Sequence, residues 1–135
     1  MKKILLFVSF LCFNFIFSQE LKTAEQGVVN TDPYTNKADQ DPIFPGGMNA
    51  FRNNIMATFD NSRTSIKGTA KSEARFLIDE NGYITKIVVS GDNKSLNKEL
   101  ERTIKSMQKT KWKPAMYNNQ PTQYWFRFPM AMNSY

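Results

Sequence analysis

Few side chains in this sequence have the types and spacing that catalysis or metal binding requires. The 135 residues include no histidine and one cysteine, Cys12. Imidazole acid–base chemistry, histidine-based nucleophile triads and most zinc sites are therefore excluded. Asp79-x-Asn81-Gly82 resembles the start of a calcium loop, but the later ligands and the closing glutamate are absent. We expect no enzyme, and no catalytic residue, metal ion or cofactor.

The sequence instead favours binding, through a strand near its C-terminus. Residues 123–132 alternate in character, and one face carries Tyr124, Phe126, Phe128, Met130 and Met132. Pro129 lacks the N–H that a sheet ladder needs, which is typical of an edge strand. An apolar edge strand presents unpaired backbone groups to an extended peptide. Trp125 points to the opposite face, where a contact role and a structural role are both open.

The first 18 residues have the pattern of a secretory signal peptide. Lys2 and Lys3 precede the apolar run Ile4–Phe17, and Ser18 is a small residue at the expected cleavage point. One alternative is a retained anchor, although 14 residues make a helix of roughly 21 Å against about 30 Å of hydrocarbon. Another is acylation at Cys12. Cleavage predicts a periplasmic protein without cysteine and hence without disulfides.

The remaining chain divides into a linker and one domain. Residues 19–42 are polar and lack helical or strand periodicity, which indicates a flexible linker before a domain at 43–135. Removing Lys2 and Lys3 lowers the formal net charge from +6 to +4. The basic excess follows one helix and its end, at Lys98, Arg102, Lys105, Lys109, Lys111 and Lys113. We interpret it as a solvated helix face and expect no nucleic-acid partner.

Two helices and three strands account for the domain. After Pro45-Gly46-Gly47, apolar residues at four-residue spacing predict a helix, and residues 95–107 predict a second one capped by Ser95. Residues 70–78 and 83–90 read as strands joined at Asn81-Gly82, a strong hairpin signal. The parity of the apolar residues changes after Ile84, which predicts a bulge near Thr85-Lys86.

The order α-β-β-α-β restricts the topology. Placing the first strand between the other two makes every neighbouring pair antiparallel and keeps the helical crossover right-handed. The fold class is therefore α+β, with two helices on one face of a three-stranded antiparallel sheet and the last strand at an edge. That placement agrees with Pro129.

With these elements assigned, residues 42–132 resemble the C-terminal domain of the TonB family, in the form common in Bacteroidetes. The resemblance rests on Pro42-x-Phe44-Pro45-Gly46-Gly47, the hairpin Phe76–Ile84, Leu96-Asn97-Lys98-Glu99, Met107, Trp112-x-Pro114 and Phe128-Pro129-Met130. Its signature structural residues are Phe44, Pro45, Gly46, Gly47, Asn81, Gly82, Trp112 and Pro114. The usual Tyr-Pro pair after the first helix is replaced near Phe59-Asp60-Asn61.

The resemblance implies a periplasmic domain that grips an extended segment of TonB-dependent outer-membrane receptors. In the family this segment adds a strand beside the last strand of the domain. The corresponding residues here are Gln123, Tyr124, Trp125, Phe126, Arg127 and Phe128. Because Pro129 cannot donate, we expect pairing to stop short of it.

Energy transduction is a separate question. Family transducers couple to a proton-driven motor complex in the inner membrane through an anchor histidine, and this sequence has no histidine. The 24 residues from 20 to 43 reach roughly 80 Å fully extended and about 27 Å as a coil. We therefore favour a binding module for a receptor or another envelope protein. The alternatives are a minimal transducer with an uncleaved, inner-membrane anchor and a protein that forms homodimers through its edge strand.

Overall fold

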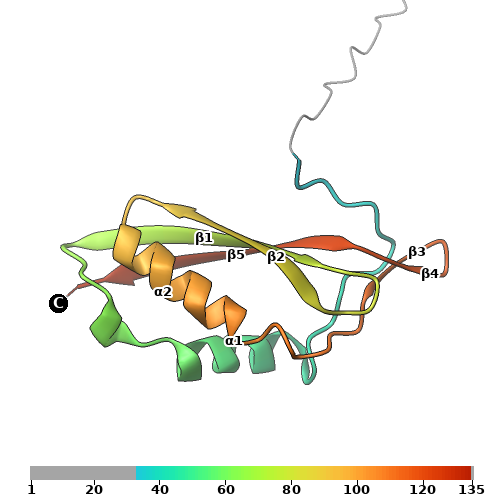
Figure 1. Ribbon diagram of the computed structural model, residues 1–135, viewed down its shortest axis with the longest axis horizontal. Coiled ribbons are helices and arrows are strands. Elements are labelled where there is room, and N and C mark those ends of the chain that lie inside the picture. Colours follow the sequence, from blue (N-terminus) through green and yellow to red (C-terminus); the bar gives the residue numbers. More distant parts are fainter. Residues whose placement is uncertain (1–32, 135) are drawn as a thin grey trace, which may run out of the picture. The chain divides into compact units, whose positions relative to one another are not determined.

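The architecture follows the predicted order of elements. The computed structural model describes residues 33–134, so the predicted signal peptide and residues 19–32 of the predicted linker lie outside the described part of the chain. The main elements are α1 (Gly47–Thr58), β1 (Thr69–Ile78), β2 (Ile84–Gly91), α2 (Lys94–Lys105) and β5 (Tyr124–Asn133) (Figure 1). A short 3-10 helix, η1 (Asn61–Arg63), follows α1.

One element was not predicted. Between Trp112 and β5 the sequence predicted no strand, but the chain forms a small hairpin of β3 (Ala115–Tyr117) and β4 (Gln120–Thr122). Its turn residues, Asn118 and Asn119, have φ angles of 49° and 62°. Asparagine tolerates this left-handed conformation better than most residues, so the pair fits a tight hairpin turn.

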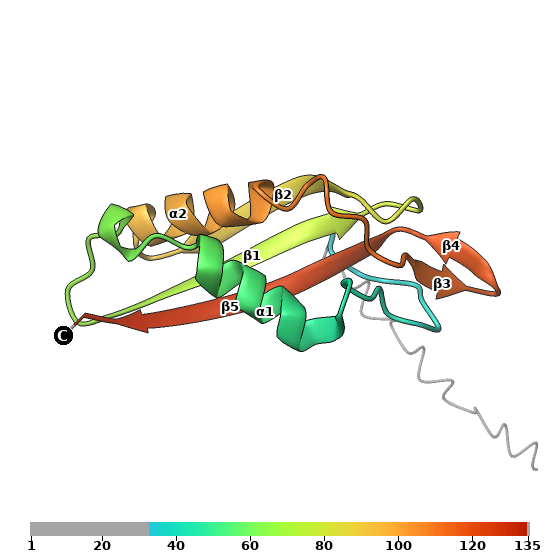
Figure 2. The same cartoon turned by 90° about the horizontal axis from the view of Figure 1, so that it is seen from below.

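The three-stranded sheet has the predicted topology. Its strand order is β2-β1-β5, with both pairs antiparallel, so β5 lies at an edge. Both helices cover the same face: α2 lies over β1 and β2, and α1 lies beside β5 (Figure 2). The predicted fold class and edge position are confirmed.

The predicted bulge is also present. Leu77 pairs with Lys86, but the next residue, Ile78, pairs with Ile84. Thr85 is therefore an extra residue in β2, and the shift turns Ile84 toward the core, where it is 4% exposed.

A close contact fixes the hairpin against the chain that precedes β3. Gly82 has a φ of +88°, and a Cβ at this position would lie 2.0 Å from the carbonyl oxygen of Trp112. Trp112 N in turn donates a hydrogen bond of 2.8 Å to Gly82 O. A residue without a side chain is required here for both its backbone conformation and this approach.

Aromatic side chains form the centre of the core. Phe51 of α1 is fully buried, and its ring lies 5.2 Å from Trp112, 5.7 Å from Phe126 and 5.4 Å from Phe128, between ring centroids. Trp112 is 1% exposed and packs in this cluster, so it is a core residue. Its indole N–H has no hydrogen-bond partner among the described residues.

The second helix begins one residue before its predicted cap. Asn93, not Ser95, is the N-cap, and its Oδ1 accepts a hydrogen bond of 2.9 Å from Leu96 N. Ser95 Oγ instead donates to Asn93 Oδ1 and accepts from Ser65 N, at 2.7 Å and 2.8 Å. Asparagine and serine are equally good caps, so the sequence alone did not separate these two positions.

A buried carboxylate joins the two helices. Glu99 is 3% exposed and accepts hydrogen bonds from Arg102 of the same helix and from Asp60 N, just after α1. Arg102 also donates to Thr58 O at 2.8 Å, so the ion pair ties the end of α1 to α2. The hydrogen bond from Arg102 is the largest influence that holds the pKa of Glu99 below its ordinary value, against the opposing effect of burial.

The contact between Gly82 and Trp112 can be tested with two glycine variants. Gly82→Ala should lower the free energy of unfolding by about 3 kcal/mol, because the new Cβ collides with the Trp112 carbonyl in addition to the strain of a positive φ. Gly68→Ala is the matched control, since Gly68 has a φ of +71° with open space around its Cβ, and should cost roughly 1 kcal/mol. Equal urea-denaturation results for both variants would contradict the contact.

The Glu99 ion pair predicts a pH dependence. Because the pKa of Glu99 is lower in the folded protein than its ordinary value of 4.5, ionised Glu99 stabilises the fold. This contribution is fully present at pH values well above 4.5 and is lost as the pH falls through the folded-state pKa. Glu99→Gln should cost about 1–2 kcal/mol at pH 7 and flatten the acid side of the stability profile. Glu101→Gln, which removes an exposed pair with Lys105, should change stability by less than about 0.5 kcal/mol. Urea denaturation from pH 7 to pH 3 measures the stability of both variants. If the two variants gave the same dependence of stability on pH, the predicted contribution of Glu99 would be ruled out.

Candidate functional site

The outer side of β5 is a row of backbone groups that face away from the sheet. In an antiparallel pair, alternate residues direct their N–H and C=O toward the partner strand. Ser134 N donates to Gly68 O at 2.8 Å, so even-numbered residues of this strand face β1. The odd-numbered residues therefore face outward: Trp125, Arg127, Pro129, Ala131 and Asn133.

Pro129 occupies one of these outward positions. Its missing N–H would point away from β1, so the proline removes no bond from the ladder with Glu73, its partner in β1. The outer edge thus has N–H donors at Arg127 and Ala131 but none between them. Whether a ligand strand stops at this gap stays a prediction.

The opposite edge of the sheet, β2, is less suited to pairing. It carries the bulge at Thr85 and an exposed lysine, Lys86, and both features are typical of edges that avoid further strands. By contrast, β5 keeps one unbroken register with β1 for ten residues. The edge at β5 is therefore better suited than β2 to accept a further strand.

The predicted site residues divide into two groups. Gln123 is exposed and lies between β4 and β5, while the other five belong to β5. Phe126 and Phe128 face the helices and pack on Phe51, so their side chains belong to the core. The side chains of Trp125 and Arg127 lie on the uncovered face, as predicted for Trp125.

The signature residues of the family resemblance have structural positions. Phe44 and Trp112 are buried together, with ring centroids 5.1 Å apart. Gly46 and Gly47 have positive φ angles of 84° and 85° at the entry to α1, a backbone conformation that glycine adopts most readily. The other members are Pro45 in the turn before α1, Asn81 and Gly82 in the hairpin turn, and Pro114, which is half-buried.

A groove lined by methionine runs along the edge on the helix side. Two neighbouring hollows, of about 430 Å³ and 250 Å³, lie between α1 and the second half of β5. Their lining includes Met48, Arg52 and Met56 from α1 and Phe128, Met130 and Met132 from β5. Met56 is 77% exposed although it lies beside an apolar surface.

The contribution of α1 to this groove was not predicted from the sequence. Met48, Arg52 and Met56 recur at four-residue spacing and so share one helix face, adjacent to the buried face of Phe51 and Ile55. This stripe was the signal that could have found them. It was overlooked because the buried stripe next to it accounts for the helix by itself.

On the uncovered face, one carboxylate of β1 lies between two guanidinium groups, one from β1 and one from β5. Arg75 and Arg127 lie directly opposite each other in the register, an arrangement of like charges that is destabilising by itself. Glu73 accepts a hydrogen bond from each guanidinium, at 2.7 Å and 2.6 Å. The hydrogen bond from Arg75 is the largest influence that lowers the pKa of Glu73, and the hydrogen bond from Arg127 adds to it. Both favour the charged form of the carboxylate.

The last residues of the predicted linker lie against the domain. Gln40 and Met116 form a backbone bridge, with hydrogen bonds of 3.2 Å and 3.0 Å, and Ile43 forms a second one with Lys113. Asn36 forms hydrogen bonds with the backbone of Trp125. Burial and a hydrogen bond to Asp41 raise the pKa of Tyr124.

Residues 33–134 contain no group of three or more His, Cys, Asp or Glu side chains that could hold a metal ion. Nor does this part of the chain contain a helix with the length and apolar character needed to cross a membrane.

Comparison with known proteins gave one match. A family model described as Gram-negative bacterial TonB protein C-terminal matches residues 63–131, slightly more than half of the chain. The match covers β1, β2, α2 and most of β5, including the candidate edge. Comparisons with curated proteins and with solved structures gave no match.

Proposed function

Since the chain belongs to the family of Gram-negative bacterial TonB protein C-terminal domains, we propose that it binds an extended segment of an outer-membrane receptor by adding a strand to β5. Domains of this family are typically periplasmic modules that interact with outer-membrane receptors. Strand addition to this edge, export by a cleaved signal peptide and a role in binding rather than catalysis are parts of the proposal.

The outward backbone groups of β5 carry the proposal. Arg127 and Ala131 each offer an N–H and a C=O to the outside, and Pro129 offers a C=O. An extended segment satisfies these groups by backbone hydrogen bonds whatever its side chains are. One module of this kind therefore suits many receptors that share little sequence.

The groove beside the edge supports a preference for apolar side chains. Every second side chain of an added strand points to the helix side of the sheet, where Met48, Met56 and Met130 line the groove. Methionine adapts its shape to different apolar partners. We propose that the ligand segment places apolar residues at alternate positions, over this groove.

The alternatives differ in what else the protein does. A minimal transducer depends on residues 1–18, which lie outside the described residues, so that alternative stays a prediction. A homodimer through β5 would occupy the same edge that the receptor segment uses. A monomer whose sedimentation coefficient does not change with concentration would exclude the dimer.

Two variants of one residue separate backbone pairing from side-chain contacts. Arg127→Pro removes the outward N–H of a strand residue whose groups do not face β1, so the fold should tolerate it as it tolerates Pro129. We expect this variant to bind a seven-residue peptide of alternating valine and threonine at least about tenfold more weakly than the wild type. Arg127→Ala is the matched control, because it loses the ion pair with Glu73 but keeps the N–H, and should bind nearly as the wild type does. Fluorescence anisotropy measures the affinities, and equal weakening in both variants would contradict backbone pairing.

Crosslinking in intact cells tests the identity of the partner. A photoreactive side chain at Ala131, on the free edge, should capture peptides of outer-membrane receptors, identified by mass spectrometry. The same group at Lys105, on the exposed side of α2, is the control and should not capture them. Recovery of no receptor from position 131 would contradict the receptor proposal.

A further inference from the structure

One side chain already occupies part of the edge where the ligand strand is proposed to bind. Asn36 Oδ1 accepts a hydrogen bond of 2.7 Å from Trp125 N, and Asn36 Nδ2 donates one of 2.9 Å to Trp125 O. A single amide group thus satisfies both outward backbone groups of Trp125. A peptide group of a neighbouring strand would make the same pair of hydrogen bonds.

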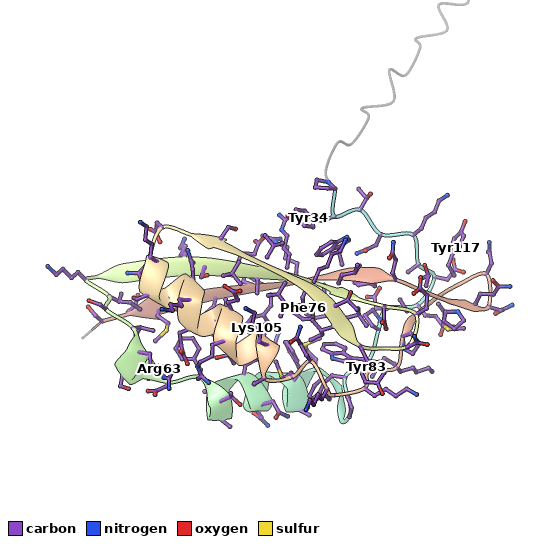
Figure 3. The ribbon with its side chains drawn as sticks, viewed as in Figure 1. Tyr34, Arg63, Phe76, Tyr83, Lys105 and Tyr117 are labelled. Atoms are coloured by element: carbon purple, nitrogen blue, oxygen red, sulfur yellow. The ribbon has the colours of Figure 1, made fainter. Side chains whose placement is uncertain are left out.

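Contacts on both sides of Asn36 hold it in this position. On the N-terminal side, the ring of Tyr34 meets Trp125 edge-on, with centroids 4.8 Å apart, and the Arg75 guanidinium lies 4.5 Å from the centre of the Tyr34 ring. Figure 3 shows Tyr34 on the side of the sheet away from α1. On the C-terminal side, the bridge between Gln40 and Met116 fixes the chain. The amide of Asn36 is therefore preorganised to bind Trp125.

Asn36 and a ligand strand require the same atoms. The segment expected from the family resemblance, Gln123–Phe128, includes Trp125, and only two of its residues within β5, Trp125 and Arg127, direct backbone groups outward. A ligand that pairs along this segment needs the N–H and C=O of Trp125, so it has to displace the amide. A ligand that leaves Asn36 in place begins at Arg127 and soon meets the missing donor of Pro129.

We infer that Asn36, held by Tyr34, is an intramolecular competitor that lowers the affinity of the edge for extended peptides. This inference rests on the proposed function, because it requires a ligand that pairs with β5. The edge can bind a peptide only in those molecules in which Asn36 has left Trp125. The smaller this fraction is, the weaker the apparent affinity of the protein for the peptide.

Amide hydrogen exchange tests the contact in the free protein, without any ligand. The wild type should protect Trp125 N–H, while Arg127 N–H, which also faces outward, should exchange rapidly. Asn36→Ala should remove the protection of Trp125 and leave the rest of the sheet unchanged. Asn53→Ala is the matched control, because Asn53 is an exposed asparagine of α1. Rapid exchange of Trp125 N–H in the wild type would overturn the inference.

Peptide affinity tests the competition. The seven-residue valine–threonine peptide should bind Asn36→Ala about tenfold more tightly than the wild type. In this variant the two exposed hydrogen bonds between residue 36 and Trp125 no longer have to break before the peptide binds. Tyr34→Ala, which leaves the amide in place but removes its packing on Trp125, should give a smaller gain. Equal or weaker binding by Asn36→Ala, with the wild type still binding, would overturn the competitor role alone. Binding by neither protein would overturn strand addition, and the competitor role with it.

Discussion

The packing of Phe51 against its neighbours is the interaction on which the rest of the structure depends. Its ring contacts Phe44, Phe76, Trp112, Phe126 and Phe128, which come from the segment before α1, from β1, from the segment before β3 and from β5. In a domain of about 90 residues, burial of this many aromatic rings supplies a large part of the hydrophobic stabilisation that the core can provide. It also fixes the position of β5, because two of the rings belong to that strand.

This packing determines how the edge can recognise a partner. The side chains of Phe126 and Phe128 are used for stability, so they are not free to adapt to a ligand. What remains on β5 is its outward backbone, the side chains of the uncovered face, such as Arg127, and the groove-lining Met130 and Met132. Recognition that relies on backbone groups is tolerant of sequence, and selectivity then has to come from the groove beside α1. Stability and the proposed recognition thus draw mostly on different atoms of the same strand, with Phe128 contributing to both the core and the groove.

The parts of the fold that follow from local patterns were predictable from the sequence. Alternation gave β1 and β5, the change of parity at Ile84 gave the bulge, and Pro129 with the order of elements gave the edge. The positive φ angles of Gly46, Gly47 and Gly82 agree with the places where glycine interrupts the pattern.

The features that were missed depend on contacts between distant residues. The bond between Asn36 and Trp125 joins residues 89 positions apart, and a lone asparagine in a polar segment has no pattern to mark it. Glu99 lies on a helix whose charged residues were predicted to face solvent. It is buried only because Thr58 and Asp60, at the end of α1, pack against it and Arg102. The β3–β4 hairpin is three residues a side, too short to show alternation.

Pro129 also affects how copies of this protein behave at high concentration. An exposed edge strand is a template on which other chains can stack, and long rows of donors and acceptors favour ordered aggregates. The proline interrupts that row near the middle of β5, and any second copy aligned with it has the same interruption. No uninterrupted ladder of ten residues can form between two such edges. The strand is therefore long enough to accept a short segment, while its own proline makes it a poor template for fibril growth.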